Sequence, residues 1–411
     1  MNYSVIASMS RNTIILTSNA YLPNIGGVEN SLVQLSKAYH AMGFRVVIIV
    51  SNVNTVNKQA LPLREITEYA TIWRYDVCFH GRQHSKLKTS LLGWQNMRRC
   101  FRSARIEFGD ALVISRYHIT TIHARLAGFS RVSYLLPGVV KFQNQPSNTQ
   151  KMEGVRQIKQ WLALFYHHAI QKIALRVAEK NFVFSSNMLN QLAQIGFDCT
   201  KVTMVSPGVD TNKFLSLDVN AQTALKGKLG LPLDKNLLLV VGRFAAAKGV
   251  EYAIRAQKEL LHTHLVLVGG GELEDYYKSL VVKLGIENSV TFVGAVADTS
   301  PFYQVASLFL MTSTYEPFGQ TILEALSCEV PVIAFRPGKT VKTATSEMLG
   351  EDACFYVNTL DASDLAKTIS CALADVEKRT QISRNGVAFV RQKYSWNALA
   401  KSLIKETNIA I

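Results

Sequence analysis

The second half of the chain alternates short, almost continuously apolar segments with segments of helical periodicity. The apolar segments are rich in Val, Leu and Phe and comprise residues 236–243, 264–271, 289–294, 308–313 and 331–335. Each has the length of a strand, and each is followed by a loop and a helical pattern. Strands that are apolar on both faces and alternate with helices indicate a parallel sheet covered by helices on both sides.

The first half follows the same rhythm less cleanly. Residues 13–18 are predicted as a strand, residues 28–43 as an amphipathic helix capped by Gly43, and residues 44–51 as a second strand. A strand, a helix and a strand in this order predict a β-α-β unit with parallel strands. Further buried strands are predicted at residues 111–115, 131–136 and 180–186.

A domain boundary is predicted at residues 206–220, SPGVDTNKFLSLDVN, where Pro, Gly and Asp interrupt the periodicity. The charge balance changes at the same place. Residues 1–206 hold 24 Lys and Arg against 9 Asp and Glu, whereas residues 207–411 hold 21 of each. The first half therefore carries the whole net charge of +15. Either this is ordinary solubilising composition, or this half meets an anionic partner such as membrane lipid, a phosphorylated substrate or nucleic acid.

Composition narrows the class of protein. With 48% apolar and 18% charged residues, the 411-residue chain is expected to fold into globular domains. No apolar run approaches the roughly 18 residues that span a bilayer, and the N-terminus lacks the pattern of a leader, so an untargeted protein is expected. The six cysteines form no C-x-x-C pair and are interpreted as buried, reduced thiols of a cytosolic protein.

Two segments of the first half combine basic and apolar side chains at helical spacing. They are residues 84–106, with Leu91, Leu92, Trp94, Phe101, Arg98, Arg99, Arg102 and Arg105, and residues 151–180. Basic amphipathic helices with Trp and Phe suit an anionic bilayer surface. The alternative is an ordinary helix that faces the core and has a solvated basic side.

The stretch EPFGQTILEAL, residues 316–326, places two glutamates among residues that belong in a core. A carboxylate among such neighbours is costly unless it has a partner. Pro317 predicts the start of a helix that runs to Cys328. Glu316 would then lie in the loop beyond a strand, where open α/β sheets bind ligands, and Glu324 would lie within the helix.

Two interpretations of these glutamates remain at this point. Carboxylates can accept hydrogen bonds from paired sugar hydroxyls, and the helix amides from Phe318 to Gln320 could bind an anion between them. Otherwise one glutamate only starts a helix and the other is bonded to backbone.

Two other loops follow strands. In VGRFAAAKGVEYAI, residues 241–254, Arg243 and Lys248 flank a small-residue turn and suit one anion, although basic pairs after strands are common. In LPNIGGV, Gly26 and Gly27 would let backbone amides approach a phosphate, or they form a simple turn. Neither G-x-G-x-x-G nor a P-loop motif is present, so dinucleotide-binding and P-loop chemistry are not supported.

In their order, these motifs resemble the retaining glycosyltransferases of the GT-B fold, particularly glycosyltransferase family 4. The hallmark E-x-F-G-x-x-x-x-E-A is matched by Glu316, Phe318, Gly319, Glu324 and Ala325. The resemblance extends over nearly the whole chain through PNIGGVE, SPGVDTNKF, VGRFAAAKG, VGGGELEDYYKSLVVKLGIENSVTFVG and the late YSW.

The resemblance implies an α/β chain with two doubly wound parallel-sheet, Rossmann-like domains that face each other across a cleft. Residues 1–206 would form the N-terminal acceptor-binding domain and residues 207–392 the nucleotide-sugar-binding domain. A C-terminal helix in residues 393–411 would cross back to the first domain.

The resemblance also implies a role for each matched residue. Arg243 and Lys248 would neutralise the donor's diphosphate. Glu316 would hold the hydroxyls of the donor sugar and Glu324 those of the ribose. The catalytic candidates are Arg243, Lys248, Glu316 and His118. The donor-binding candidates are Gly26, Gly27, Gly242, Gly270, Val293, Phe318, Gly319, Gln320, Thr321 and Glu324.

One segment departs from the family pattern. Many members carry a histidine beside the transferred sugar in a pattern like D-x-x-x-x-H, but here Asp110 leads to Ser115, followed by Arg116, Tyr117 and His118. Either His118 takes this role, or Arg116 replaces it on the acceptor side, or the function is absent. The other interpretation of His118 is a surface loop histidine.

We therefore expect a retaining glycosyltransferase that moves a sugar from a nucleotide-diphosphate sugar to a glycan or lipid-linked acceptor in surface polysaccharide or glycolipid synthesis. No His, Asp and Glu cluster has metal-ligand spacing, so neither a metal nor another cofactor is expected. The expected location is the cytoplasm, peripheral at the membrane face, with an anionic membrane surface but no nucleic acid as partner. The alternatives are a nucleotide-sugar epimerase of GT-B architecture and a non-catalytic basic binding protein.

Overall fold

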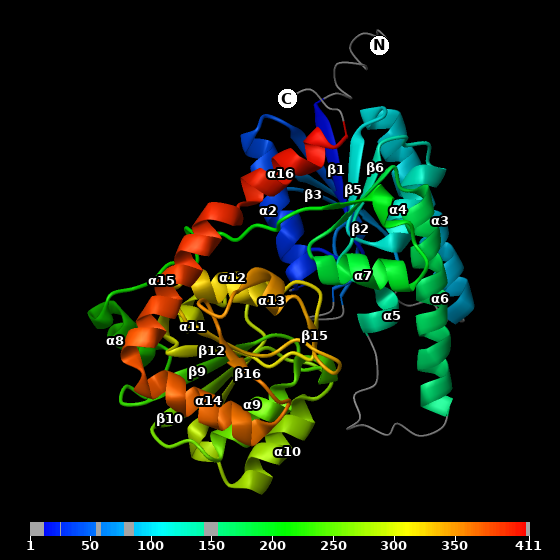
Figure 1. Ribbon diagram of the computed structural model, residues 1–411. Coiled ribbons are helices and arrows are strands. Elements are labelled where there is room, and N and C mark those ends of the chain that lie inside the picture. The colour runs from blue at the N-terminus through cyan, green and yellow to red at the C-terminus, as the bar shows by residue number, and fades with distance from the viewer. Residues whose placement is uncertain (1–11, 25, 55–58, 78–85, 144–154, 408–411) are drawn as a thin grey trace.

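The computed structural model describes residues 12–24, 26–54, 59–77, 86–143 and 155–407. In these residues, two parallel-sheet units follow one another along the chain, and helices cover both faces of each sheet (Figure 1). This confirms the predicted α/β class with two doubly wound domains.

The first sheet has the strand order β3-β4-β2-β1-β5-β6-β7-β8. Its neighbouring strands are parallel except for β3 and β4, an antiparallel pair that the sequence patterns did not predict. The strands are β1 (Thr13–Thr17), β2 (Arg45–Ser51), β3 (Arg64–Ile66), β4 (Thr71–Tyr75), β5 (Leu112–Ser115), β6 (Val132–Leu135), β7 (Lys180–Val183) and β8 (Val202–Met204). The helices are α2 (Gly27–Ala41), α3 (Lys86–Phe108), α4 (His118–Leu126), α5 (Val140–Gln143), α6 (Val155–Val177) and α7 (Ser186–Gln194), and a 3-10 turn, η1, spans Cys199–Lys201.

Side chains that alternate along each strand bury both faces of this sheet. In β2, Val46 and Ile48 pack into the cluster shared with α2, whereas Val47 and Ile49 pack into the cluster shared with α3. The continuous apolar run of β2 is therefore explained by two cores, one on each face.

The second sheet has the order β11-β10-β9-β12-β14-β16, and its strands are parallel throughout the described residues. The strands are β9 (Asn236–Val241), β10 (Thr263–Val268), β11 (Val290–Gly294), β12 (Leu308–Met311), β14 (Val332–Phe335) and β16 (Phe355–Val357), with a separate short pair, β13 (Tyr315–Glu316) and β15 (Lys342–Thr343). The helices are α8 (Val219–Lys228), α9 (Val250–Gln257), α10 (Glu274–Leu284), α11 (Ser300–Val305), α12 (Gln320–Ser327), α13 (Thr345–Met348), α14 (Ala362–Ala374), α15 (Val376–Lys393) and α16 (Trp396–Lys405), with 3-10 turns η2 (Ala246–Lys248) and η3 (Glu287–Ser289).

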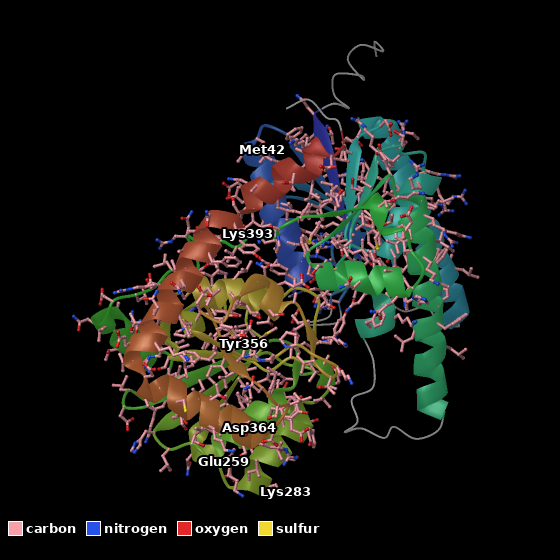
Figure 2. All side chains as sticks on the ribbon, viewed as in Figure 1. Met42, Glu259, Lys283, Tyr356, Asp364 and Lys393 are labelled. Carbon is pink, nitrogen blue, oxygen red and sulfur yellow. The ribbon has the colours of Figure 1, made fainter. Side chains whose placement is uncertain are left out.

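The end of the chain returns to the first domain. Helix α15 runs along the second domain, the chain bends just after Lys393, and α16 lies against α2 (Figures 1 and 2). Leu399 and Leu403 of α16 are fully buried in the core that α2 covers, and the Tyr39 hydroxyl donates a hydrogen bond of 3.2 Å to the carbonyl of Ala400.

The predicted helix start at Pro317 is wrong. Helix α12 begins at Gln320, because Gly319 adopts a left-handed φ of 105° and occupies the N-cap position. The residues before it do not form a plain loop either, since Tyr315 and Glu316 pair as β13 with β15. This short pairing fixes the backbone at Glu316.

Of the five cysteines that the structure describes, Cys100, Cys328 and Cys354 are buried as predicted, and none forms a disulfide. The prediction is wrong for Cys371, which is exposed on α14, and Cys199 is half-buried. Cys78 lies outside the described residues. Within the described residues, no helix combines the length and apolarity needed to cross a bilayer.

Candidate active site

The centre of the candidate site is an ion pair between Lys248 and Glu316. Lys248 ends the turn after β9, Glu316 follows β12, and the Lys248 ammonium donates a hydrogen bond to the Glu316 carboxylate. The side chains are 29% and 15% exposed, so both remain within reach of a ligand.

The position of this pair in the sheet has a simple origin. The chain moves from β9 through β10 to β11 on one side and then returns to place β12 on the other side of β9. The carboxyl ends of β9 and β12 therefore flank the topological switch point, where open α/β sheets bind ligands.

Backbone contacts hold the two loops together. The Thr312 hydroxyl donates a hydrogen bond of 2.8 Å to the carbonyl of Lys248, and the Thr314 amide donates one of 2.9 Å to the carbonyl of Ala247. Gly249 has a φ of 60°, and a Cβ there would lie 2.2 Å from the carbonyl oxygen of Thr312. Only glycine permits this approach.

Arg243 lies just beyond the carboxyl end of β9, before the turn that carries Lys248. Its side chain is exposed and takes part in no ion pair between described residues. The next residue, Phe244, is fully buried, and its amide donates a hydrogen bond of 2.8 Å to the carbonyl of Gly270. The buried phenylalanine thus anchors the loop while the arginine stays available to a ligand.

Two further donor-binding candidates of this domain lie at different distances from this loop. Gly242 is half-buried, and a Cβ on it would meet the Lys248 side chain at 3.7 Å. Val293 is half-buried in β11, two strands away from β9.

The N-terminus of α12 lies directly after Glu316, and no side chain caps it. Phe318 is buried, and its ring centroid is 5.9 Å from that of Phe184 in the first domain. The Gln320 side-chain amide donates a hydrogen bond of 2.6 Å to the carbonyl of Gly208. Thr321 is half-buried, and its hydroxyl contacts the Met311 sulfur at 3.9 Å. Phe318 and Gln320 thus contact residues outside the second sheet.

Glu324 is buried within α12, eight positions after Glu316 in the sequence. Burial raises the pKa of its carboxyl to about 7, and nearby Tyr303 and Lys213 oppose the rise by smaller amounts. A glutamate with this pKa changes its charge near neutral pH, so its ionisation is sensitive to a ligand that donates hydrogen bonds.

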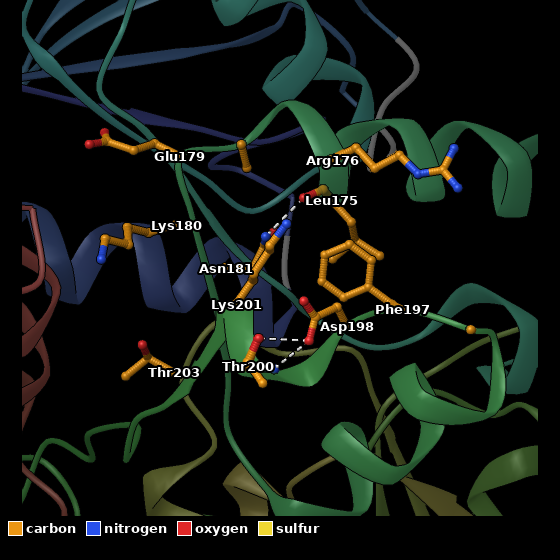
Figure 3. Close-up of a pocket in the computed structure, with 12 residues that line it drawn as sticks. Leu175, Arg176, Glu179, Lys180, Asn181, Phe197, Asp198, Thr200, Lys201 and Thr203 are labelled. Carbon is orange, nitrogen blue, oxygen red and sulfur yellow. Dashed lines mark hydrogen bonds between the residues drawn. The ribbon is translucent and has the colours of Figure 1, made fainter.

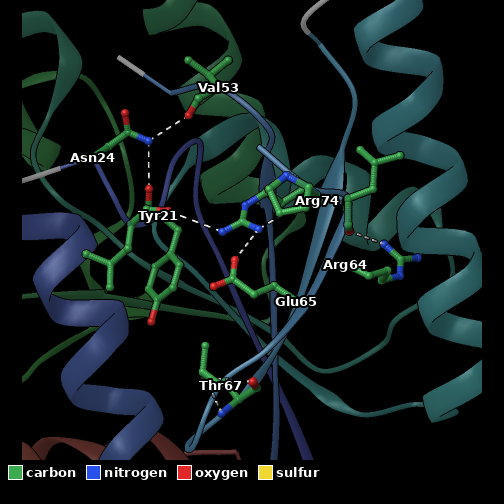
Figure 4. Close-up of polar contacts among 11 residues, drawn as sticks. Tyr21, Asn24, Val53, Arg64, Glu65, Thr67 and Arg74 are labelled. Carbon is green, nitrogen blue, oxygen red and sulfur yellow. Dashed lines mark hydrogen bonds and ion pairs between the residues drawn. The ribbon is translucent and has the colours of Figure 1, made fainter. Parts of the chain in front are cut away.

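Gly26 and Gly27 lie at the start of α2 in the first domain. The loop before them is held by Asn24, whose side-chain amide donates hydrogen bonds of 2.8 Å to the carbonyls of Tyr21 and Val53 (Figure 4). No side chain caps α2. A Cβ on Gly27 would have no atom within 4 Å, whereas a Cβ on Gly26 would clash with the Glu29 carboxylate. The turn is therefore open at Gly27 and occupied by Glu29 at Gly26.

Arg116 follows β5 and is only 5% exposed. Its guanidinium lies over the ring of Phe184, with 5.1 Å from Cζ to the ring centroid. Nε and Nη1 are sealed from solvent and have no hydrogen-bond partner among the described residues. Burial lowers the pKa of Arg116 to about 10, while Tyr134 and Glu29 oppose the shift.

His118, two residues after Arg116, begins α4. It is buried rather than on the surface, and its Nε2 lies 2.9 Å from Nδ1 of His167 on α6. Burial, followed by His167, lowers the pKa of His118 to about 3, so the imidazole is neutral at physiological pH. The structure thus pairs His118 with His167 of α6, whereas Arg116 lies over the ring of Phe184.

Sequence patterns missed two residues of this neighbourhood. Phe184 contacts both Arg116 and Phe318, and its only signal was its position near the end of the strand predicted at residues 180–186. Glu29 lies in the first turn of α2, where burial raises its pKa and Arg116 lowers it.

The two basic amphipathic helices differ from each other. In α3, Phe101 is fully buried and Arg98, Arg99 and Arg102 are exposed, but Leu91 and Trp94 are exposed as well. In α6, large apolar residues are exposed on one side: Leu162, Phe165, Tyr166 and Ile173. This helix extends well beyond α5 at the edge of the first domain (Figure 1).

A pocket of about 490 Å³ lies in another part of the first domain (Figure 3). Its lining includes Lys180 and Asn181 at the start of β7 and Lys201 and Thr203 around the start of β8. These are the amino ends of the strands, opposite the end at which Arg116 lies. The pocket is therefore separate from the candidate active site.

Comparison with known families decides the class of protein. Residues 25–213 match Glycosyltransferase Family 4, and residues 221–389 match the glycosyl transferases group 1. The two matches follow one another along the chain and together cover both sheets. The chain belongs to glycosyltransferase family 4.

Individual relatives agree with this class. The glycosyltransferase is 31% identical over 217 residues to an uncharacterized glycosyltransferase of Methanocaldococcus jannaschii, covering 51% of this chain and 55% of that protein. It is 27% identical over 208 residues to the lipopolysaccharide core biosynthesis glycosyltransferase LpsE of Rhizobium meliloti, covering 50% and 57%. These alignments span only about half the length of the curated relatives.

Solved structures show the same fold over the whole glycosyltransferase. HepE of Anabaena, solved in complex with UDP and glucose, superposes with a TM-score of 0.73 over 97% of this chain and 99% of that chain, at 19% identity. The architecture is therefore the GT-B fold.

Proposed function

We propose that the protein transfers a sugar from a nucleotide-diphosphate sugar to an acceptor with retention of anomeric configuration. The observation that carries this proposal is the Lys248–Glu316 pair beside exposed Arg243 at the switch point of the second sheet. Two cations and one carboxylate in this arrangement suit a diphosphate joined to a polyhydroxylated ring.

Each residue has a chemical task in this reaction. Lys248 and Arg243 stabilise negative charge on the departing diphosphate, and the uncapped amides of α12 add partial positive charge. Glu316 accepts hydrogen bonds from sugar hydroxyls and so orients the ring. Glu324 accepts hydrogen bonds from the ribose. These groups stabilise the leaving group without a metal or other cofactor.

The donor class has support from the relatives. The structure of HepE, which shares the fold, contains UDP and glucose. A nucleotide sugar explains why one site contains both cations, Arg243 and Lys248, and a carboxylate, Glu316. The family matches give no support to the alternatives of an epimerase or a basic binding protein.

A panel of nucleotide sugars tests this proposal. Thermal shifts should identify the nucleoside diphosphate that binds, because a ligand that binds only the folded state raises its stability. Turnover can then be measured without an acceptor, as slow hydrolysis of the matching nucleotide sugar that releases the nucleoside diphosphate. No shift with any donor in the panel would argue against the proposal.

We further propose that the acceptor is lipid-linked and is used at an anionic membrane surface. The supporting observation is the exposed apolar stripe of α6, where residues three, four and seven positions apart share one helix face. Phe165 is 62% exposed in this stripe. The basic surface of the first domain, including Arg98, Arg99 and Arg102, would add attraction to anionic lipid.

Vesicle sedimentation tests the membrane proposal. The wild type should sediment with phosphatidylglycerol vesicles and much less with phosphatidylcholine vesicles, and salt should weaken binding. The Leu162→Ser and Ile173→Ser double variant should lose most of this binding. A double variant of exposed residues in the second domain, Val219→Ser and Val376→Ser, is the matched control. Equal loss in both variants, or no binding by the wild type, would defeat the membrane proposal.

A further inference from the structure

Arg116 occupies the switch point of the first sheet. The chain moves from β1 to β2 on one side, and β5 lies on the other side of β1. The Arg116 amide donates a hydrogen bond of 2.8 Å to the carbonyl of Thr17, the last residue of β1. This residue therefore marks the ligand-binding end of the first domain, as Lys248 does in the second.

The guanidinium of Arg116 lacks the partners that a buried charge needs. Arg74 provides the comparison within the same domain, because it is also buried but donates hydrogen bonds to Glu65 at 2.7 Å and to the carbonyl of Pro62 at 3.0 Å (Figure 4). Arg116 has neither an ion pair nor a side-chain hydrogen bond among the described residues. Burial of an unpaired charge is costly, so a ligand is the expected partner.

The surroundings of Arg116 suit an anionic group. Phe184 supports the guanidinium from one side and connects it to Phe318, which follows Glu316. The N-terminus of α2 belongs to the same neighbourhood, because Glu29 in its first turn acts on Arg116 electrostatically. Glu29 is close enough to influence Arg116 electrostatically, but the two side chains form no direct ion pair.

We propose that Arg116 binds a phosphate or carboxylate carried by the acceptor or by the transferred sugar. This inference rests on the proposed function, because it assigns a second substrate group to the same reaction. The two charges of a donor diphosphate are matched by Arg243 and Lys248. Arg116 is a third cation, and its planar fork suits a further oxyanion.

Calorimetry with inorganic phosphate tests the acceptor as the source of this group. The titration is performed with the protein already saturated with the nucleoside diphosphate that the panel identifies. The wild type should bind phosphate in addition, and Arg116→Gln should weaken this binding at least tenfold. Arg64→Gln is the matched control, because Arg64 also lies over an aromatic ring, Trp73, but is exposed. It should bind phosphate like the wild type.

A second titration tests the transferred sugar as the source. If the donor sugar carries the oxyanion, the wild type should prefer the nucleotide sugar with glucuronate to the one with glucose. Its affinity for the nucleoside-diphosphate glucuronate should be at least tenfold higher than for the nucleoside-diphosphate glucose. Arg116→Gln should remove this preference. Additional phosphate binding identifies the acceptor, whereas a glucuronate preference identifies the sugar.

Stability separates this proposal from a structural role. Without ligand, Arg116→Gln and Arg116→Met should melt at or above the wild-type temperature, because each removes an unpaired buried charge. The proposal is overturned if both variants unfold or melt well below wild type. It is also overturned if phosphate and glucuronate binding are both absent, or if they persist in Arg116→Gln. Failure of the proposed function looks different, since no nucleoside diphosphate would then bind the wild type at all.

Discussion

Lys248 and Glu316, 68 positions apart in the sequence, form an ion pair at the carboxyl ends of two neighbouring strands. The lysine comes from the turn after β9 and the glutamate from the short strand after β12. In the proposed function, the diphosphate of a nucleotide sugar would contact the lysine and the sugar hydroxyls would contact the glutamate, so the ion pair would be preorganised for the donor.

Lys248→Ala and Arg243→Ala should each weaken binding of the nucleoside diphosphate by about tenfold, the equivalent of about 1.4 kcal/mol for each lost charge contact. The double variant should lose less than the sum, because both side chains meet one diphosphate. Titration calorimetry measures all three affinities. Lys278→Ala, which removes an ion pair from the exposed face of α10, is the control and should bind normally. Unchanged affinity in both single variants would remove these residues from the site.

Glu324 should make the stability of the fold depend on pH. Its pKa of about 7 in the folded state exceeds the ordinary glutamate value, so the folded state holds a proton that the unfolded chain has released. The free energy of unfolding should therefore fall as pH rises from about 4.5 to 7, by about 3 kcal/mol, and stay level above that range. Urea unfolding of the wild type and Glu324→Gln at pH 5 and pH 8 measures this difference. Parallel pH profiles in the two proteins would contradict the prediction.

His118 should contribute to acid sensitivity with the opposite sign. Its pKa of about 3 lies below the ordinary histidine value, so the unfolded chain binds a proton that the folded state excludes. The contribution of this group to the free energy of unfolding is fully present above about pH 6.5. It decreases as the pH is lowered and is smaller by about 2 kcal/mol at pH 5. His118→Asn should lose less stability than wild type between pH 7 and pH 5. A histidine on the exposed end of α2, His40, supplies the control variant His40→Asn. If both variants retained the wild-type acid profile, His118 would not be the buried neutral group described here.

Arg74→Gln should destabilise the first domain by about 2 kcal/mol, because it removes charge-assisted hydrogen bonds from a buried side chain. The estimate stays at the low end because Glu65 is 42% exposed and can be solvated alone. Chemical unfolding, with Arg64→Gln as control, measures the effect. Stability equal to wild type would show that the Arg74–Glu65 pair is energetically neutral.

The sequence patterns predicted the parts of the fold that depend on continuous apolar strands. Val46 to Val50 are buried on both faces of the first sheet, and this double burial produces the unbroken run seen in the sequence. The patterns missed β13 and β15 because two-residue strands have no periodicity. They placed the start of α12 too early, because Pro317 is a common helix-start signal but Gly319 takes the N-cap conformation.

The candidate site was only partly predictable for a related reason. Glu316, Lys248 and Arg243 belong to motifs, so their residue types and spacing indicated them. The unpaired state of Arg116 depends on what the fold leaves around it, and no pattern within residues 110–118 carries that information. In the same way, helical periodicity could not distinguish Phe101 of α3, which is in the core, from Phe165 of α6, which is exposed.

The most direct test of the central claim is the rate at which nucleoside diphosphate is released from the donor identified in the panel, compared between wild type and Glu316→Gln. The substitution keeps the size of the side chain but removes the charge that pairs with Lys248. We predict that Glu316→Gln folds normally, still binds the nucleoside diphosphate, and turns over at least about 100-fold more slowly, the scale of losing one oriented electrostatic contact. Wild-type turnover by the folded variant would contradict the assignment of this site.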